Sequence, residues 1–158
     1  MIRLRPAGDR ADDLATVREL FDEYQRSVDA PVCFASFDAE LASLPAPYFA
    51  ILLAEKNGRP AGCVALKALD PVSAELKRLY VRPAFRGLGL GEKLIRAAAA
   101  QAQTHLFARL RLDTLPSMAA AIALYRRLGF SAIARYNDIP EPDALFFELS
   151  FSPRRTVD

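Results

Sequence analysis

A run of glycines between a strand and an alanine-rich helix restricts the fold of this chain more than any other feature. Residues 74–81 are predicted to form a strand, Pro83 turns the chain, and alternate glycines at 87–91 lead into a helix predicted over 92–103. Glycines let the backbone approach an anion closely, and the start of a helix adds unpaired N–H donors and the positive end of its dipole. This loop is therefore predicted to bind a phosphate or a pyrophosphate.

Periodicity and turn residues predict the elements around this loop. Further strands are expected near residues 2–5, 48–55, 61–69, 107–113, 130–136 and 144–151, and further helices near 14–28, 37–44 and 117–129. Asn57-Gly58 predicts a tight hairpin, because both residues accept positive φ, and Asp9 and Ser117 are expected to cap helices. Antiparallel strands thus come first, and a β-α-β crossover follows. The predicted class is α/β with a mixed sheet.

Three phosphate-binding patterns compete for the glycine loop. The P-loop requires Gly-Lys followed by Ser or Thr, whereas Lys93 is followed by Leu94. The dinucleotide fingerprint requires Gly-x-Gly-x-x-Gly directly after a strand, whereas this loop reads Gly-x-Gly-x-Gly and begins well beyond Val81. Asp113 does lie about where the ribose-binding acid of the dinucleotide pattern would fall, so that alternative stays open.

The third pattern fits the loop. The segment that resembles the pyrophosphate loop of the GNAT acetyltransferases, Arg/Gln-x-x-Gly-x-Gly/Ala, is Arg86-Gly87-Leu88-Gly89-Leu90-Gly91. A second segment, residues 121–130, resembles the family's Ala-x-x-Leu-Tyr-x-x-x-Gly-Phe, and the order of elements is similar from residue 2 to about residue 151. The resemblance implies one GNAT domain over residues 1–158, with a twisted mixed sheet of about seven strands and about four helices.

The resemblance also implies a site for acetyl-CoA. Strand 74–81 would bulge and separate from strand 107–113 to admit the pantetheine arm, and backbone N–H groups of the loop would hold the pyrophosphate. The cofactor-binding residues that it implies are Leu79, Tyr80, Val81, Arg86, Gly87, Leu88, Gly89, Leu90, Gly91 and Glu92. The N–H of Leu79 would polarise the thioester carbonyl, Tyr125 would protonate the departing thiolate, and Glu75 would act as the general base.

Both catalytic residues also have a plainer interpretation. Tyr125 could be a core tyrosine of its helix, and Glu75 could pair with Lys77 or Arg78 instead of serving as a base. The Asn that many members of the family have seven residues before the tyrosine is here Met118, which weakens a contact with the cofactor arm.

Charge, cysteine and histidine content argue against other classes. The 21 basic and 19 acidic residues are interspersed, without the dense basic stripe of a nucleic-acid binder. No apolar run approaches the roughly 20 residues of a membrane span, and the N-terminus lacks a signal sequence, so a cytoplasmic protein is expected. Cys33 and Cys63 are expected to pack as small hydrophobes, and His105 to interact with a helix C-terminus, so no metal site is predicted.

The predicted function is therefore transfer of the acetyl group of acetyl-CoA to a primary amine, by direct attack in a ternary complex and without a metal. The acceptor would be a small molecule or a peptide, and a homodimer is compatible with the resemblance. The alternative is a non-catalytic sensor that binds CoA or another nucleotide; Tyr125 and Glu75 favour the enzyme.

Overall fold

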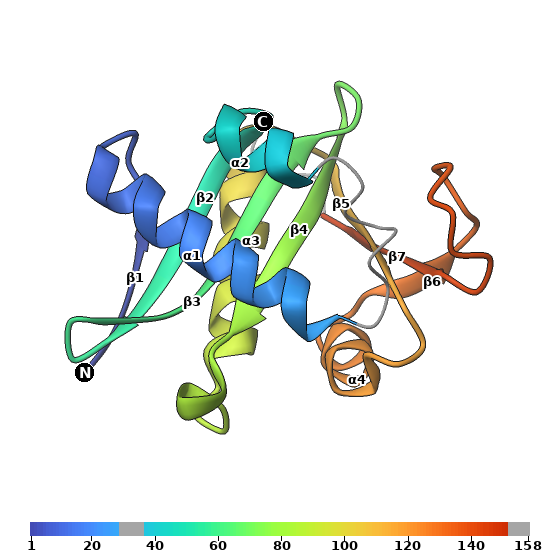
Figure 1. Cartoon of the computed structure of the whole chain (residues 1–158). Coiled ribbons are helices and arrows are strands. Elements are labelled where there is room, and N and C mark those ends of the chain that lie inside the picture. Colours follow the sequence, from blue (N-terminus) through green and yellow to red (C-terminus); the bar gives the residue numbers. More distant parts are fainter. Residues whose placement is uncertain (29–36, 152–158) are drawn as a thin grey trace, which may run out of the picture.

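The computed structural model describes residues 1–28 and 37–151, which form one seven-stranded sheet with helices on both faces (Figure 1). Its elements are β1 (Ile2–Pro6), α1 (Ala11–Ser27), α2 (Phe37–Ser43), β2 (Tyr48–Lys56), β3 (Arg59–Ala68), β4 (Ser73–Val81), the 3-10 helix η2 (Pro83–Phe85), α3 (Leu90–Thr104), β5 (Arg109–Thr114), α4 (Ala119–Arg127), β6 (Ser131–Ile133) and β7 (Leu145–Ser150). The predicted order of strands and α-helices is confirmed. Cys33 lies outside the described residues.

The sheet is mixed, as predicted. Its strands lie in the order β1-β2-β3-β4-β5-β7-β6, and neighbouring strands are antiparallel except for β4 and β5. Parallel neighbours need a crossover connection, and α3 supplies it. The glycine loop therefore lies where β4 ends and the crossover begins.

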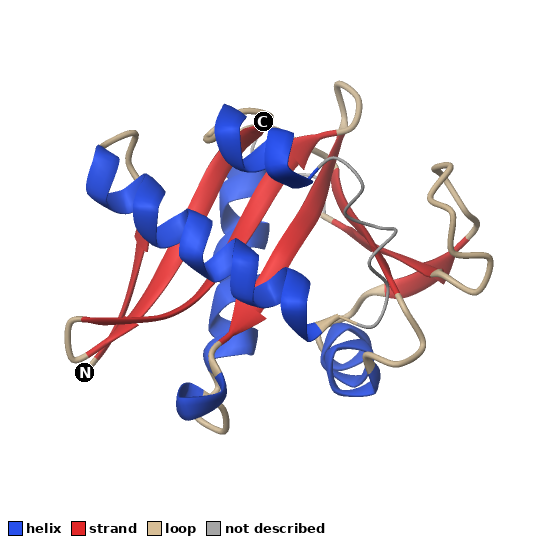
Figure 2. Ribbon diagram, in the orientation of Figure 1, coloured by secondary structure: helices blue, strands red, loops and turns tan. Residues whose placement is uncertain are grey.

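The helices divide between the two faces of the sheet (Figure 2). α1 and α2 cover one face, where Phe21 and Phe37 join a buried cluster with Leu53. On the other face, Leu94 of α3 and Tyr125 of α4 join the larger cluster of buried residues. Both clusters draw on alternate residues of the same strands, because successive side chains of a strand point to opposite faces.

The turn between β2 and β3 is the predicted tight hairpin. Asn57 and Gly58 have φ of +52° and +78°, which is the pair of positive φ values that a two-residue hairpin turn requires. β2 extends to Lys56 and β3 begins at Arg59, so the two strands reach one and two residues further toward the turn than predicted.

Two predicted helix caps are wrong. α1 begins after Arg10, and no side chain caps it, whereas Asp9 was the expected cap. The carboxylates at residues 12–13 supply the negative charge that favours a helix N-terminus. α4 begins after Met118, again without a side-chain cap, so Ser117 does not have the predicted role.

α3 begins two residues before the predicted start, at Leu90. Gly89 precedes it with φ of +76°, a left-handed conformation that glycine adopts without steric cost. The loop is thus shorter than the motif suggested, and Leu90 and Gly91 already belong to the first helical turn.

β4 contains a bulge against β3. Arg78 and Leu79 together oppose the single residue Val64, and the register shifts across them. Arg78 has φ of +58°, which is uncommon for a residue other than glycine. A bulge interrupts the ladder of hydrogen bonds and re-aims the backbone, so the predicted bulge is confirmed and centred on these two residues.

β4 and β5 separate after a short stretch of pairing. Their parallel register runs from Ser73–Arg109 to Glu75–Arg111 and ends there, although β4 continues to Val81. The predicted separation of the two strands is therefore confirmed. Among the described residues, the backbone of β4 beyond Glu75 has no strand partner on the β5 side.

Candidate active site

A groove of about 510 Å³ lies where the starts of α3 and α4 meet the end of β4. We call it the phosphate groove; its lining residues are Leu79, Val81, Phe85, Arg86, Gly87, Gly89, Leu90, Gly91, Glu92, Ser117, Met118, Ala119, Ala120, Ala121, Leu124 and Arg127. The predicted cofactor-binding residues thus line it, with the exception of Tyr80 and Leu88. Most of its lining residues are apolar, and the charged ones are Arg86, Glu92 and Arg127.

Tyr80 and Leu88 have their side chains elsewhere. The Tyr80 side chain lies against α1 and its hydroxyl donates to Glu23 Oε1 at 3.2 Å. Leu88 is 39% exposed and lines a different pocket, together with Arg59 and Phe85. Either residue can therefore contact a ligand in the phosphate groove through its main chain only.

The glycine loop presents backbone to the phosphate groove. Gly87 and Gly89 have φ of +83° and +76°, and a Cβ on either would meet no atom within 4 Å, so the space before them is open. The first N–H groups of α3 follow at once, and a helix of 15 residues adds its dipole. The N–H of Arg86 already donates to Pro83 O at 3.3 Å, which leaves the amides after Arg86 as the natural anion site.

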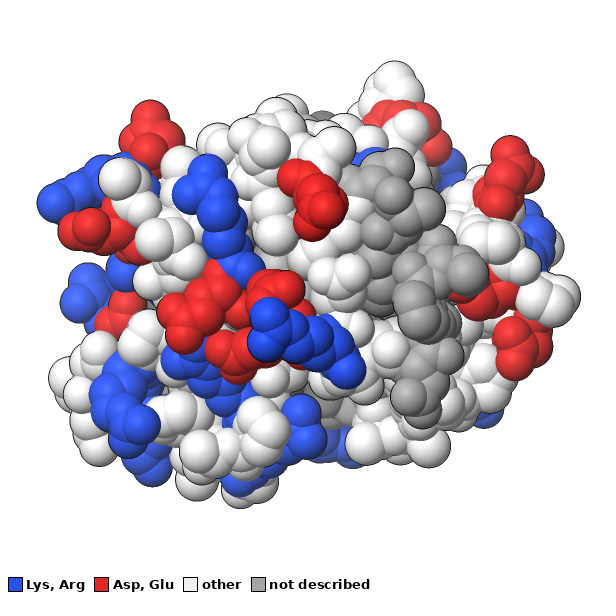
Figure 3. All heavy atoms as spheres, viewed as in Figure 1, with Lys and Arg blue, Asp and Glu red and all other residues white. Residues whose placement is uncertain are grey.

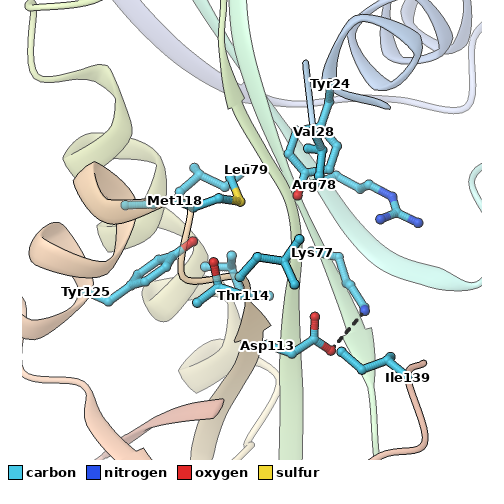
Figure 4. Close-up of a pocket in the computed structure, with 13 residues that line it drawn as sticks. Tyr24, Val28, Lys77, Arg78, Leu79, Asp113, Thr114, Met118, Tyr125 and Ile139 are labelled. Atoms are coloured by element: carbon cyan, nitrogen blue, oxygen red, sulfur yellow. Dashed lines mark ion pairs between the residues drawn. The ribbon is translucent and has the colours of Figure 1, made fainter. Parts of the chain in front are cut away.

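A smaller cavity of about 100 Å³ opens between the separated strands β4 and β5 (Figure 4). We call it the central cavity; it is lined by Tyr24, Val28, Leu76, Lys77, Arg78, Leu79, Asp113, Thr114, Leu115, Met118, Ala121, Tyr125 and Ile139. Leu79, Met118 and Ala121 line both spaces, so the phosphate groove and the central cavity meet at the bulge. A long thin ligand can thus run from the glycine loop to the gap between the strands.

Tyr125 reaches the central cavity from α4. Its side chain is 5% exposed and packs against the rings of Phe130 and Phe147, with centroids 5.5 and 6.4 Å away. Figure 4 shows its hydroxyl directed toward Leu79 and Met118. Burial raises the pKa of Tyr125 well above its usual value, so the phenol stays protonated at neutral pH and can donate a proton. Tyr125 is thus both a core residue and a cavity residue, and the two sequence interpretations are compatible.

Glu75 is buried and already engaged. It is 2% exposed, its Oε2 accepts a hydrogen bond of 2.5 Å from Tyr136, and its Oε1 lies 3.5 Å from Lys77 Nζ. The alternative of an ion pair with Lys77 is thus present, whereas Arg78 pairs with Glu40. Burial beside Glu75 raises the pKa of Tyr136, which keeps the donor protonated.

Asp113 is the carboxylate that the described residues bring to the wall of the central cavity. Its Oδ2 accepts a hydrogen bond of 2.8 Å from Asn137 and lies 3.5 Å from Lys77 Nζ. Figure 4 shows its second oxygen directed toward the cavity, across from Tyr125. From the sequence, Asp113 was a candidate only as a ribose ligand. Asp113 follows the buried Leu112 in the alternating pattern of β5. This alternation indicates that the Asp113 side chain faces away from the core.

Other reactive side chains of the described chain lie away from the cavity. His105 ends α3, with Nδ1 2.9 Å from Gln101 O and its ring against Phe49, so its predicted role at the helix C-terminus is confirmed. Cys63 is fully buried, and burial raises the pKa of its thiol, which keeps it in the unreactive protonated form. Within residues 1–28 and 37–151, no group of three His, Cys, Asp or Glu side chains is arranged to hold a metal ion.

The surface over α1 carries charges of both signs. Figure 3 shows acidic and basic side chains side by side on this face, and the ion pairs Arg26–Asp22, Arg82–Glu19 and Arg82–Glu23 contribute to it. None of the helices in the described part of the chain is long and apolar enough to cross a membrane.

Comparison with known proteins places this geometry in a family. The sequence model of the acetyltransferase (GNAT) family matches residues 14–130. An uncharacterized N-acetyltransferase of Schizosaccharomyces pombe is 32% identical over 146 residues, which is 89% of this chain and 90% of that protein. Thialysine N-epsilon-acetyltransferase of Bos taurus is 30% identical, with 82% of each chain covered.

A solved structure shares the fold. A GNAT family acetyltransferase from Elizabethkingia anophelis, which has acetyl-CoA bound, superposes with a TM-score of 0.64 over 95% of this chain and 98% of that one. The two sequences are 22% identical, so the likeness concerns the fold.

Replacement of Gly89 tests the phosphate groove. Gly89→Val should raise the KM for acetyl-CoA at least tenfold, about 1.4 kcal/mol, because a branched side chain would stand where the loop backbone must approach phosphate. The matched control is Gly58→Val, since Gly58 has φ of +78° and equally open surroundings but lies in the β2–β3 turn. Steady-state kinetics on both folded variants is the measurement. An equal KM in the two variants would mean that the pyrophosphate binds elsewhere.

Proposed function

The chain belongs to the acetyltransferase (GNAT) family. We propose that it transfers the acetyl group of acetyl-CoA to a primary alkyl amine, by direct attack in a ternary complex. The observation that carries this proposal is the junction of the phosphate groove and the central cavity at Leu79. A cofactor and an acceptor that enter from the two spaces would meet there. The family supports an enzyme over the non-catalytic sensor.

The cofactor would follow the phosphate groove. Its pyrophosphate would accept hydrogen bonds from the amides of residues 87–92, and its pantetheine arm would lie along the free edge of β4 from Val81 to Leu79. The N–H of Leu79, which lies at the bulge of β4, would donate to the thioester oxygen. Such a donor stabilises the negative charge that develops on this oxygen as the amine attacks.

The acceptor amine must lose a proton before it can attack. An alkyl ammonium has a pKa near 10.4, so at neutral pH it arrives protonated. We propose that Asp113 is the group that first accepts this proton, because it lines the central cavity. Glu75, in contrast, is covered by Tyr136 and Lys77. The predicted role of Glu75 as the base is the competing assignment, and it needs a water or a movement of Tyr136 to reach the amine.

The leaving group would take its proton from Tyr125. As the nitrogen–carbon bond forms and the carbon–sulfur bond breaks, the electron pair of the latter stays on sulfur. Tyr125 is protonated and points toward Leu79, so it can donate to this thiolate. Met118 stands at the family's usual Asn position and would give the cofactor arm an apolar contact there.

The acceptor would enter past α1 and the loop before β7. Tyr24 and Val28 form one apolar side of the central cavity and Ile139 the other, with Asp113 and Lys77 between them. This lining suits an amine on an aliphatic chain, in a small molecule or a peptide, and the similarity to a thialysine N-epsilon-acetyltransferase supports such an acceptor. A single domain, a cytoplasmic location and a homodimer stay predictions from the sequence.

Measurements of turnover test the proposed function and the role of Tyr125 as the general acid together. Purified protein should release free thiol from acetyl-CoA when the right primary amine is present, and Tyr125→Phe should lower kcat by about 10²-fold, the low end for acid–base catalysis. The KM for acetyl-CoA should change little, because only a hydroxyl is lost. Tyr80→Phe serves as the control for loss of a hydroxyl outside the central cavity, because the Tyr80 hydroxyl donates to Glu23 of α1.

The contrary outcomes are distinct. Full turnover by Tyr125→Phe on every accepted amine would remove Tyr125 from proton transfer. Stabilisation by acetyl-CoA in a thermal-shift assay, without turnover of any amine, would favour the sensor.

Paired carboxylate variants identify the base. Asp113→Asn should lower kcat/KM for the amine by about 10²-fold near neutral pH, and the loss should shrink at alkaline pH, where the free amine is already abundant. Glu75→Gln keeps the shape and the contact with Tyr136, so its loss should be several-fold smaller. The pH profile of kcat/KM for both variants is the measurement. A reversed ranking would return the role of base to Glu75.

A further inference from the structure

Arg78 has a backbone conformation that its side chain does not favour. Its φ of +58° belongs to the left-handed region, where a Cβ crowds the following carbonyl oxygen. It also sits in the middle of β4, between Lys77 and Leu79, which line the central cavity. A strained residue persists only where its surroundings hold it, and such residues gather at functional sites. The contacts of Arg78 therefore show what maintains the bulge.

The guanidinium of Arg78 is held by Glu40 of α2. Nε donates to Oε2 at 3.0 Å and Nη2 donates to Oε1 at 2.7 Å, a two-pronged pairing that fixes the plane of the guanidinium. The two side chains are 12% and 16% exposed, so water screens the pair little. The guanidinium also lies over the ring of Phe37, 5.6 Å from its centre.

The backbone of Arg78 is held as well. The Cys63 thiol, on the neighbouring strand β3, lies 3.4 Å from Arg78 O and donates to it. Side chain and main chain are thus fixed from two different elements, and the rotation of the Arg78–Leu79 peptide is restricted. Because that peptide contains the Leu79 N–H, its direction depends on the same contacts.

We propose that Glu40 and Arg78 form a positioning pair, which holds the β4 bulge so that the Leu79 N–H is aimed at the thioester oxygen. This inference rests on the proposed function, since it assumes that Leu79 serves the thioester. Neither residue is assigned a catalytic role. The pair connects α2, on the acceptor side of the sheet, to the backbone that would stabilise the oxyanion.

The positioning pair has a kinetic consequence. A misdirected Leu79 N–H would weaken a hydrogen bond that is strongest in the transition state, so kcat should fall while the ground-state affinity for acetyl-CoA is kept. The phosphate groove, which supplies most of the cofactor contacts, lies on the other side of the bulge and does not include Glu40. A merely structural ion pair would affect stability and not separate kcat from KM.

The test compares two half-buried carboxylates that each bind one arginine. Glu40→Gln removes the charge-assisted pair with Arg78 at the bulge. Glu55→Gln removes a charge-assisted pair with Arg5 at the far edge of the sheet. There Arg5 Nε lies 2.6 Å from Glu55 Oε1, and the Glu55 side chain is 15% exposed. Glu40→Gln should lower kcat about tenfold, which is less than the loss in kcat when an oxyanion donor is removed outright. Its KM for acetyl-CoA should stay within about twofold of the wild-type value. Glu55→Gln should leave both unchanged.

Backbone NMR gives a readout that does not need turnover. The intraresidue amide–Hα NOE and the Cα shift of Arg78 report its φ, and both should move toward extended values in Glu40→Gln but not in Glu55→Gln. If Glu40→Gln does not fold, Arg78→Lys keeps the positive charge without the two-pronged geometry and should show the same changes in smaller measure.

Different results would overturn the positioning pair and the proposed function. Equal kcat in the two glutamine variants, or a KM that rises in step with the loss of kcat, would rule out the positioning pair. If wild-type protein turns over no amine, the proposed function fails and the NMR comparison still decides whether Glu40 holds the bulge.

Discussion

The separation of β4 from β5 is the constraint on which the site depends. A parallel pair in the middle of a sheet normally satisfies its backbone along its length, but here pairing stops at Glu75 while β4 continues to Val81. Buried backbone donors and acceptors need partners, so an edge of β4 that no described strand pairs with is costly unless a ligand occupies it. A ligand that runs along the strand would pair with these backbone groups, and the bulge at Arg78 lies among them.

The two sides of this gap have different chemistry, which suits two different substrates. On the side of α3 and α4, the phosphate groove offers backbone amides, a helix N-terminus and apolar side chains to an anionic cofactor with an apolar arm. On the side of α1 and the loop before β7, the lining brings Asp113 and Lys77 together with aliphatic residues. Most of the affinity for the cofactor would come from the side of α3 and α4. Selectivity for the acceptor would come from the side of α1 and the loop before β7. Tyr125 and Leu79 stand where the two sides meet.

Features that neighbouring residues encode could be predicted from the sequence, whereas contacts between distant residues could not. The glycine loop, the Asn57-Gly58 turn and the order of strands follow from neighbouring residues, and the structure has them. The caps at Asp9 and Ser117 failed because residue preference does not fix where a chain enters its first helical turn. Glu75 was expected to act as a base or to pair with Lys77 or Arg78, and its hydrogen bond from Tyr136, 61 residues later, was not predicted. Likewise Glu40 meets Arg78 across 38 residues, and no spacing rule predicts such a contact.

A structure of the protein with acetyl-CoA bound would test this arrangement. We expect the pyrophosphate on the amides of residues 87–92 and the pantetheine arm along β4. The thioester oxygen should lie within about 3.2 Å of the Leu79 nitrogen, the upper limit for such a hydrogen bond. Arg78 should keep its positive φ. A thioester that lies away from Leu79, or a cofactor outside the gap between β4 and β5, would contradict it.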